Sequence, residues 1–176
     1  TLEQLLYGLM IPSGNDAANA IADHIAGSTD AFVEKMNAKA KELGATHTHF
    51  VNANGLHSTD HYTTAYDLYL IFNECIKHDD FVKIINSSSY TAHITGADGT
   101  KRDVKWEPTN YYAKGEATPP DNVTIIGGKT GTTKGAGNCL ILLTKDSSGN
   151  PYISIIMGAG SKPLLYQDMT SMLSKI

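Results

Sequence analysis

The spacing of apolar residues changes once along the chain, near residue 89, and this change limits the folds that the chain can adopt. Before that point, apolar residues recur every three or four positions, which is typical of amphipathic helices. After it, short apolar runs alternate with turn residues, which is typical of strands. Helices that come first and strands that come later predict an α+β fold in which the two kinds of element are segregated.

Five helices are expected in the first half, and local signals mark several of their ends. Thr1 and Gln4 could form a capping box, and Pro12 ends the first helix because proline disfavours helical geometry in the residue before it. Gly27 and Gly44 are typical residues for helix ends. The helices are predicted over residues 1–10, 16–26, 30–43, 64–77 and 80–85.

The second half predicts a hairpin, three further strands and a final helix. The hairpin strands are expected over residues 89–95 and 101–106, and residues 107–122 are expected to form a loop. The last two strands are apolar along most of their length, so we expect helices to cover both faces of the sheet. The later elements are predicted over residues 123–133, 138–145, 152–158 and 162–176.

Length and composition fit one folded unit over residues 1–176. The hydrophobic fraction is 41%, the charged fraction is 18% and the net charge is -4. These values indicate a globular protein, and nothing in the charge indicates a nucleic-acid partner. No apolar run approaches the roughly 18 residues that a membrane-spanning helix needs.

Two short polar stretches carry the candidate chemistry. Ser13-Gly14-Asn15-Asp16 lies at the break between two expected helices, and residues 127–133 (Gly-Gly-Lys-Thr-Gly-Thr-Thr) lie on an expected strand. Taken alone, the first stretch is explained by helix capping, since Ser, Asn and Asp are all good N-cap residues. The Gly-Lys-Thr of the second resembles a phosphate-binding loop, but that loop needs glycine where Val123 stands. Nucleotide binding is therefore not favoured.

Together the two stretches are much more specific. A Ser-x-Asn triplet on a turn between helices, followed much later by Lys-Thr-Gly on a strand, resembles the pattern of penicillin-recognising serine enzymes. The flanking sequence resembles the low-molecular-weight D-alanyl-D-alanine carboxypeptidases in particular. The matching residues are 5–18, 36–37, 43–46, 50, 54–56, 61–65, 67, 128–133, 136–137 and 139. The resemblance implies a β-lactamase/D,D-peptidase-like fold, in which a helical cluster adjoins an antiparallel sheet flanked by helices.

One part of the family pattern does not occur in these residues. The family's nucleophile lies in a Ser-x-x-Lys motif upstream of the Ser-x-Asn triplet, and no serine here is followed by lysine three positions later. Because the chain begins at Thr1 without an initiator methionine or a signal peptide, we expect a fragment truncated at its N-terminus. It is expected to lack the nucleophile helix and two strands, and to be inactive by itself.

The resemblance assigns catalytic roles to three residues. In the family, a serine attacks the amide between two terminal D-alanines of a peptidoglycan stem peptide, and water then hydrolyses the acyl-enzyme. By resemblance, Ser13 relays a proton toward the leaving nitrogen, Asn15 holds the substrate amide, and Lys129 supplies a fixed positive charge. No metal or cofactor is implied.

The resemblance also assigns the substrate-binding residues. Thr130 and Thr132 would bind the terminal carboxylate, and the backbone N–H of Thr132 would be one of two oxyanion donors. Gly131 would let the strand edge approach the peptide, which would add to the sheet as a strand. Since β-lactams mimic the D-Ala-D-Ala end, the parent protein is expected to be acylated by penicillin.

Further expectations concern alternatives, location and assembly. A β-lactamase of similar fold, or a non-catalytic module that binds peptidoglycan peptides, would share both motifs.

The resemblance implies an exported protein that acts in the cell wall or at the outer face of the cytoplasmic membrane, in peptidoglycan biosynthesis and cell shape. Strands missing from the sheet would bare an apolar edge and face, so self-association is expected.

Two pairs of histidines are candidate metal ligands, but their spacing is not specific. His57 and His61 are four residues apart, but the zinc motif of that spacing needs glutamate where Ser58 stands. His47 and His49 alternate as strand neighbours would, and neither pair has an evident third ligand. Metal binding is therefore not favoured.

Two aromatic residues and two cysteines leave alternatives open. Tyr111 and Tyr112 either border the substrate groove or form a packed aromatic loop, and the packed loop is favoured. Cys75 and Cys139 allow one disulfide, while the apolar run around Cys139 favours a small core residue.

Overall fold

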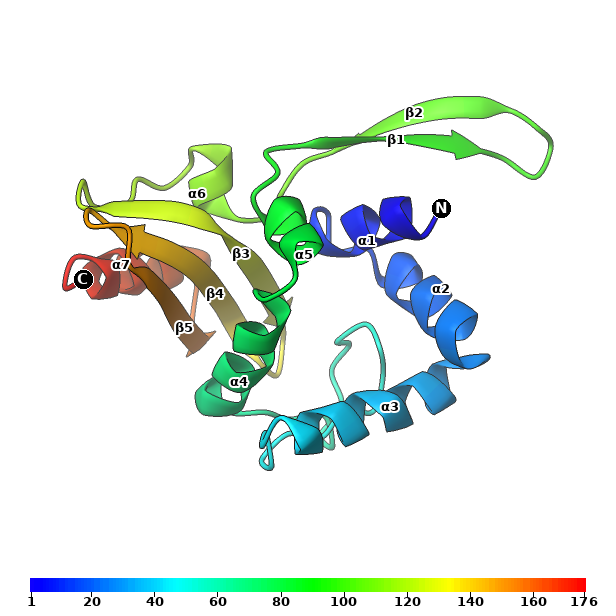
Figure 1. Ribbon diagram of the computed structural model, residues 1–176, viewed down its shortest axis with the longest axis horizontal. Helices are drawn as coiled ribbons and strands as arrows, with labels where there is room; N and C mark the ends of the chain where they lie inside the picture. The colour runs from blue at the N-terminus through cyan, green and yellow to red at the C-terminus, as the bar shows by residue number, and fades with distance from the viewer.

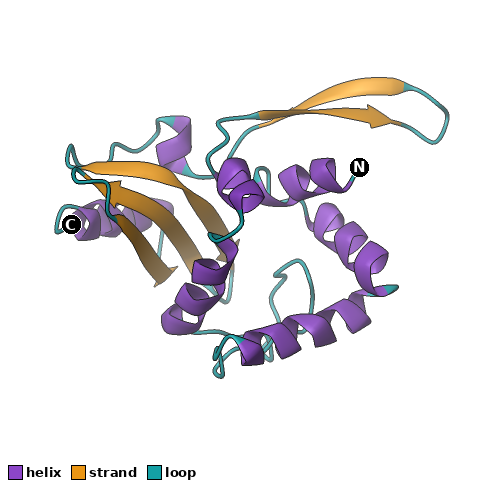
Figure 2. Ribbon diagram, in the orientation of Figure 1, coloured by secondary structure: helices purple, strands orange, loops and turns teal.

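The computed structural model describes all 176 residues and has helices first and strands later, as expected. The first five helices are α1 (Leu2–Met10), α2 (Asn15–Ala26), α3 (Thr29–Glu42), α4 (Ala65–Cys75) and α5 (Asp79–Ile85). The later elements are β1 (Tyr90–Thr95), β2 (Lys101–Trp106), α6 (Tyr111–Lys114), β3 (Val123–Thr133), β4 (Gly137–Asp146), β5 (Pro151–Ala159) and α7 (Lys162–Leu173). Figure 2 shows the segregation: α1 to α5 lie together, and the three-stranded sheet lies beside them.

The predicted elements are confirmed, with one omission. α6 is a single helical turn within residues 107–122, which were expected to be a loop throughout. Its N-cap, Asn110, accepts a hydrogen bond from the backbone N–H of Tyr112 at 3.1 Å. One turn is too short to show helical spacing of apolar residues, so the pattern could not reveal it.

Local chemistry sets the helix ends as predicted. The hydroxyl of Thr1 accepts from the backbone N–H of Gln4, and the side chain of Gln4 accepts from the amino group of Thr1, which completes the capping box. α2 ends at Gly27, whose φ of 80° lies in the left-handed region that glycine adopts without strain. None of the helices has the length and apolarity of a membrane span.

The three long strands form an antiparallel sheet in the order β3-β4-β5, with β4 in the centre. Successive side chains of β4 point to opposite faces. Leu140 and Leu142 face α7, while Leu143 faces α4 and α5 through contacts with Phe72 and Ile85. The expectation that helices cover both faces of the sheet is confirmed, and Figure 1 shows α7 behind the sheet and α4 and α5 in front of it.

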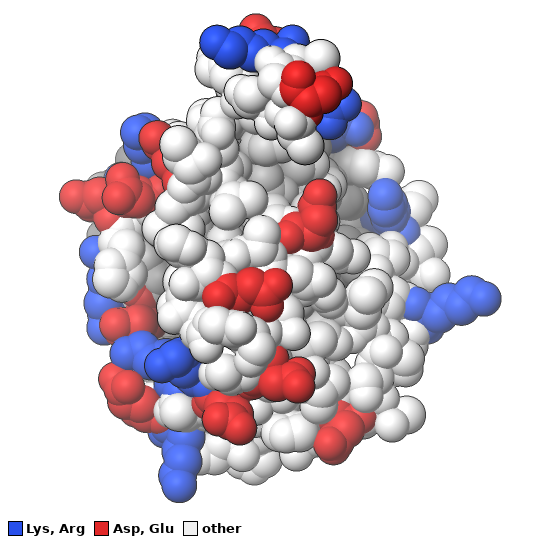
Figure 3. Space-filling model, turned by 90° about the vertical axis from the view of Figure 1, so that its right-hand side faces the viewer, with Lys and Arg blue, Asp and Glu red and all other residues white.

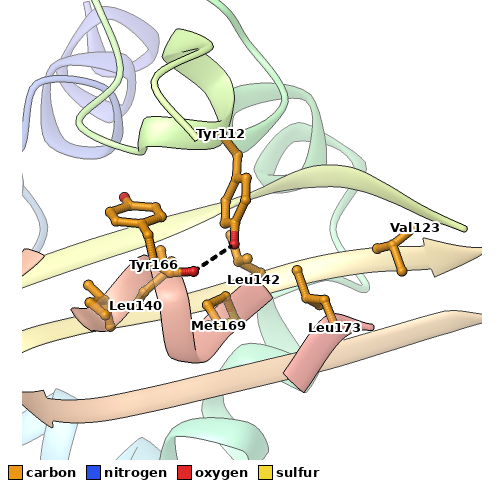
Figure 4. Packing of buried hydrophobic residues seen from close by; sticks show 8 residues of the cluster. Tyr112, Val123, Leu140, Leu142, Tyr166, Met169 and Leu173 are labelled. Carbon is orange, nitrogen blue, oxygen red and sulfur yellow. Dashed lines mark hydrogen bonds between the residues drawn. The ribbon is translucent and has the colours of Figure 1, made fainter. Parts of the chain in front are cut away.

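The largest core cluster lies between the sheet and α7. Figure 4 shows Leu142 of β4 close to Met169 and Leu173 of α7, with Tyr112 reaching down from α6. The hydroxyl of Tyr112 lies 2.7 Å from that of Thr170 and also donates to the backbone carbonyl of residue 166 at 3.5 Å. This packing anchors the segment before β3 onto α7.

β1 and β2 form a separate hairpin that projects from the helical cluster. Its base rests on α1, where the ring of Tyr90 stacks on that of Tyr7 with centroids 3.9 Å apart. Its outer part is polar, and Figure 3 shows charged side chains of both signs gathered on this projection.

Candidate active site

The two polar stretches meet at one groove. Ser13 follows α1 and Lys129 lies on β3, and the Nζ of Lys129 donates a hydrogen bond to the Oγ of Ser13 across 116 residues of sequence. The groove has a volume of about 490 Å³. All six residues singled out from the sequence line it: Ser13, Asn15, Lys129, Thr130, Gly131 and Thr132.

The turn between α1 and α2 presents Ser13 to the groove. Ser13 has a φ of 60°, the only positive value of a residue other than glycine. That conformation costs about 1 to 2 kcal/mol for a residue with a side chain. The backbone N–H of Gly14 donates to the carbonyl of Gly8 at 2.9 Å and fixes the turn. The strained backbone therefore aims the hydroxyl of Ser13 toward β3.

Helix capping does not explain Ser13. The N-cap of α2 is Gly14, and no side chain caps the helix. The hydroxyl of Ser13 bonds Lys129 instead, and the side chain of Asn15 is exposed in the groove. Ser13 therefore does not cap α2, because the tertiary contact takes its hydroxyl away from the helix end. Asp16 does accept from the backbone N–H of Ala17 in the first turn, at 2.9 Å.

Lys129 is a partly buried lysine. Burial lowers its pKa from 10.5 to about 8, because an ammonium group loses hydration there. Its Nζ donates to the Oγ of Ser13 and, at 2.8 Å, to the carbonyl of Thr130, and it forms no ion pair. A group with this pKa can exchange a proton near neutral pH.

β3 is an end strand of the sheet and changes from covered to open along its length. A Cβ on Gly127 would lie 2.2 Å from the carbonyl oxygen of Ile85, so α5 packs tightly against this part of the strand. A Cβ on Gly128 would lie 2.0 Å from the carbonyl oxygen of Ile141 on β4. At Gly131 nothing lies within 4 Å of that position, so the strand is open to the groove there.

Hydroxyl groups line the open part of β3. The Oγ1 of Thr130 lies 2.5 Å from the Oγ1 of Thr109, and the Oγ1 of Thr132 donates to the Oδ1 of Asn138 at 3.4 Å. Sequence reasoning missed Thr109, which lies in the segment before α6. Its only signal was its place in the long loop that precedes the Lys-Thr-Gly strand.

A second group that sequence reasoning missed forms one wall of the groove. Residues 54–56 line it, and Leu56 is 56% exposed. The amide of Asn54 donates to the Oδ1 of Asn19 on α2 at 3.2 Å, which ties this wall to the helical cluster. The segment was noticed for its resemblance to the family, but no role was given to it.

The two tyrosines of α6 take different positions. Tyr111 lines the groove and stacks on Tyr166 of α7, with ring centroids 4.6 Å apart and an interplanar angle of 8°. Tyr112 is buried in the core beside α7. Each of the two interpretations therefore holds for one tyrosine, because successive residues of a short helix point in different directions.

Both cysteines are free thiols. Cys139 lies on β4 beside Gly131 and lines the groove, so the expectation of a core residue is wrong. Its Sγ accepts from the backbone N–H of Gly158 at 3.5 Å. The apolar run that follows Cys139 lies in the core, but Cys139 itself lies near the start of β4, where the strand borders the groove.

The histidines do not gather into a metal site. His57 and His61 lie in a loop rather than on one helix face, and His49 forms an isolated bridge with Tyr62. The Nδ1 of His61 accepts from the backbone N–H of Val51 at 3.1 Å, and burial lowers the pKa of this imidazole. No cluster of three or more His, Cys, Asp or Glu side chains is placed to hold a metal ion.

Comparison with known proteins gives a consistent result. The sequence profile of the D-alanyl-D-alanine carboxypeptidase family matches residues 1–161. The D-alanyl-D-alanine carboxypeptidase DacF of Bacillus subtilis is 33% identical over 178 residues, which cover 98% of this chain and 42% of that protein. The D-alanyl-D-alanine carboxypeptidase of Streptomyces sp. strain K15 is 32% identical over 181 residues, which cover 99% of this chain and 60% of that protein.

Solved structures show the same fold. The crystal structure of the Streptomyces K15 DD-transpeptidase superposes with a TM-score of 0.88 at 31% identity, over 99% of this chain and 66% of that one. The predicted α+β, D,D-peptidase-like fold is thereby confirmed. The chain spans between 42% and 60% of the length of the two curated relatives. Since the family profile covers most of its residues and its fold agrees, the chain belongs to the D-alanyl-D-alanine carboxypeptidase family.

Proposed function

We propose that the protein to which these 176 residues belong is a serine-type D-alanyl-D-alanine carboxypeptidase. It would remove the terminal D-alanine from peptidoglycan stem peptides through an acyl-enzyme and would be acylated by penicillin. The observation that carries the proposal is the hydrogen bond from Lys129 to Ser13 in the groove beside β3. It joins the two motifs that family members share, at a place where β3 is open to a ligand.

Ser13 and Lys129 would act as a proton relay. The hydroxyl of Ser13 accepts from Lys129 and keeps its own proton for donation to the leaving nitrogen. With a pKa of about 8, Lys129 is mostly protonated at pH 7 and can restore the proton that Ser13 gives up. These 176 residues contain no Ser-x-x-Lys motif that could supply the attacking serine.

The remaining residues would hold the peptide. The side-chain amide of Asn15 makes no hydrogen bond within the chain and can both donate to and accept from the substrate amide. The peptide would lie along the open edge of β3, where Gly131 leaves room. The hydroxyls of Thr130 and Thr132 would bind its carboxylate, and the N–H of Thr132 would donate to the oxyanion.

The proposed substrate fixes where the protein would act. Peptidoglycan stem peptides lie outside the cytoplasmic membrane, so the protein would be exported and would work in the wall or at the outer face of that membrane. Its action on stem peptides would contribute to cell shape. The β-lactamase alternative is not favoured, because the matching profile and the curated relatives are carboxypeptidases.

Nuclear magnetic resonance titration of the 176-residue chain tests the proposed groove. A diacetylated lysyl-D-alanyl-D-alanine peptide is expected to shift the amide resonances of residues 130–132 and of Ser13. The matched control is the same peptide with two L-alanines, which should shift them much less. If the two stereoisomers shift the same resonances equally, or neither shifts them, the proposal is wrong.

Intact mass after incubation with benzylpenicillin tests the assignment of the nucleophile. We expect no covalent adduct on this chain, since it lacks the Ser-x-x-Lys motif. A stoichiometric adduct would identify a serine within these residues, Ser13 first, as the nucleophile and would overturn the relay role given to it.

We also infer that the chain self-associates through the outer edge of β5. β5 ends the sheet, so its outer backbone groups have no strand partner, and Tyr152 and Met157 on it are exposed. An uncovered strand edge of this kind pairs readily with another chain.

A further inference from the structure

A second cavity lies on the other side of the turn that carries Ser13. It has a volume of about 540 Å³ and is lined by α1, the start of α2 and the hairpin of β1 and β2, so we call it the hairpin cavity. Ser13 and Asn15 of the turn line the groove. Pro12, Gly14 and Asp16 line the hairpin cavity instead. The turn therefore separates two hollows, and the Ser-x-Asn motif accounts for only one of them.

Trp106 of β2 forms the aromatic wall of the hairpin cavity. Its six-membered ring packs over Gly8 of α1, where a Cβ would lie 3.1 Å from the nearest ring atom. The indole also stacks on Tyr90, with ring centroids 5.9 Å apart and an interplanar angle of 21°. A ring that packs against two neighbours is held in place, and the indole N–H makes no hydrogen bond within the chain.

Polar groups without a partner complete the lining. The Oδ1 of Asp16 accepts from the backbone N–H of Ala17 at 2.9 Å, while its Oδ2 makes no hydrogen bond. The hydroxyl of Thr95 on β1 has no partner either. The amide of Gln4, by contrast, donates to the carbonyl of His93 at 3.2 Å and ties α1 to β1. The hairpin cavity thus offers a carboxylate oxygen, a hydroxyl and an indole N–H on a fixed frame.

The charge and size of the lining residues limit the ligands that would bind. No lysine or arginine lines the hairpin cavity, so an anion would find no side-chain countercharge there. Asp16 is its one acidic residue. Small apolar side chains supply much of the remaining wall, namely Ala17 and Ala20 of α2 and Ala92 of β1. The lining favours a neutral ligand that has both polar groups and apolar surface.

A sugar with an N-acetyl group has this chemistry. One face of a pyranose ring presents C–H groups, which pack on the electron-rich face of an aromatic ring such as that of Trp106. An acetamido group has an N–H, a carbonyl and a methyl, which match the carboxylate of Asp16, the indole N–H and the alanine side chains. The volume also lies within the range of small-molecule sites, roughly 300 to 1,000 Å³.

We propose that the hairpin cavity binds an N-acetylated sugar of the glycan that carries the stem peptide. The choice of this glycan as the source rests on the proposed function, whereas the sugar chemistry rests on the lining alone. Because one turn separates the hairpin cavity from the groove, a wall fragment could place its peptide in the groove and its sugar in the cavity.

The test uses Trp106 as a reporter, because it is the only tryptophan of the chain. Triacetylchitotriose, a trimer of N-acetylglucosamine, is titrated into the 176-residue chain while tryptophan emission and the indole N–H resonance are followed. We expect a saturable shift of both, with the amide resonances of residues 92–95 moving and those of residues 130–132 unmoved. Maltotriose lacks the acetamido group and should bind about tenfold more weakly.

Matched variants locate the site. Asp16→Asn keeps an Oδ1 for the N–H of Ala17 but replaces a charged acceptor by a neutral one, so triacetylchitotriose should bind about fivefold more weakly. Asp23→Asn, an exposed change on the same helix, should bind like wild type. Trp106→Leu should abolish the shifts at residues 92–95.

The outcomes separate this inference from the proposed function. If the trimer leaves the indole and residues 92–95 unmoved, or moves residues 130–132 instead, the inference is wrong. Equal binding of maltotriose would overturn the assignment to an N-acetylated sugar, and equal weakening by Asp16→Asn and Asp23→Asn would overturn the assignment to this cavity. The D-alanyl peptide tests the proposed function independently at residues 130–132. If that peptide fails while the trimer binds, the proposed function is refuted and the stem-peptide glycan is refuted as the source of the sugar.

Discussion

Lys129 shows how the fold changes the chemistry of one side chain. Burial lowers its pKa to about 8, while the unfolded chain keeps a value near 10.5. Between these two values the unfolded state binds more protons than the folded state, so stability should rise with pH in this range. Below pH 8 the full cost of charging the buried amine is present, at most roughly 3 kcal/mol. The position of Lys129 therefore brings the pKa of its amine closer to neutral pH and lowers the stability of the folded chain.

A titration of the lysine side chains checks this directly. We expect the Cε resonance of Lys129 to titrate with a midpoint near pH 8, and Lys129→Met to remove the rise in stability between pH 8 and 10.5. Urea unfolding at pH 7.5 and pH 10 measures the second effect. A midpoint for Lys129 near the ordinary lysine value of 10.5 would contradict the burial argument.

Two glycines of β3 differ in the space around them, and the difference predicts opposite results. Gly128→Ala would place a Cβ 2.0 Å from the carbonyl oxygen of Ile141, so β3 and β4 would have to separate. We expect a loss of about 2 to 3 kcal/mol in the free energy of unfolding. Gly131→Ala meets nothing within 4 Å and should leave stability unchanged. Thermal unfolding of both variants compares them, and equal losses would show that the register of β3 is not set by Gly128.

At the scale of elements, two polar side chains, one buried and one partly buried, hold the long segment between α3 and α4. The amide of Asn37 on α3 makes two hydrogen bonds of 2.8 Å with the backbone N–H and carbonyl of Phe50. Asp67 on α4 is 1% exposed and accepts from the N–H of His47 and the hydroxyl of Thr48, at 2.8 and 2.7 Å. These contacts give an irregular segment a fixed path, which brings residues 54–56 to the wall of the groove.

Removing the Asn37 contact should loosen that wall. Asn37→Ala leaves the N–H and carbonyl of Phe50 without their partner, and we expect a loss of about 2 kcal/mol. Amide hydrogen exchange should rise at Phe50 and at residues 54–56, with little change in β4. Lys35→Ala, an exposed change on the same helix, is the control. Unchanged exchange at Phe50 would mean that other contacts alone position the segment.

At the scale of the whole molecule, the sheet ends at an uncovered edge. β5 pairs only with β4, and Met157 on β5 is 38% exposed. We expect sedimentation velocity to show association that increases with protein concentration, and Met157→Lys to shift the chain toward monomer because an edge charge opposes pairing. Leu2→Lys, an exposed change on α1, should have no such effect. A single monomeric species at every concentration would contradict the inference.

The elements were predictable because their signals are local. The capping box of Thr1 and Gln4, the stop at Gly27 and the continuous apolar run of β4 each depend on neighbours within a few positions. The errors fall where a distant contact decides. Cys139 faces the groove instead of the core. Capping, which explains Ser13 when its stretch is taken alone, gives way to the contact with Lys129.

The sequence by itself determined the kinds of element, their order and the two motifs, and their combination indicated the family. Only the tertiary structure decided that Ser13 and Lys129 touch, that Lys129 has a pKa of about 8, and that Thr109 and Lys162 belong to the same groove. The physical reason is that hydrogen-bonding partners, burial and electrostatic surroundings depend on segments that pack together across more than 100 residues of sequence. Periodicity and spacing report only on the chain near each residue.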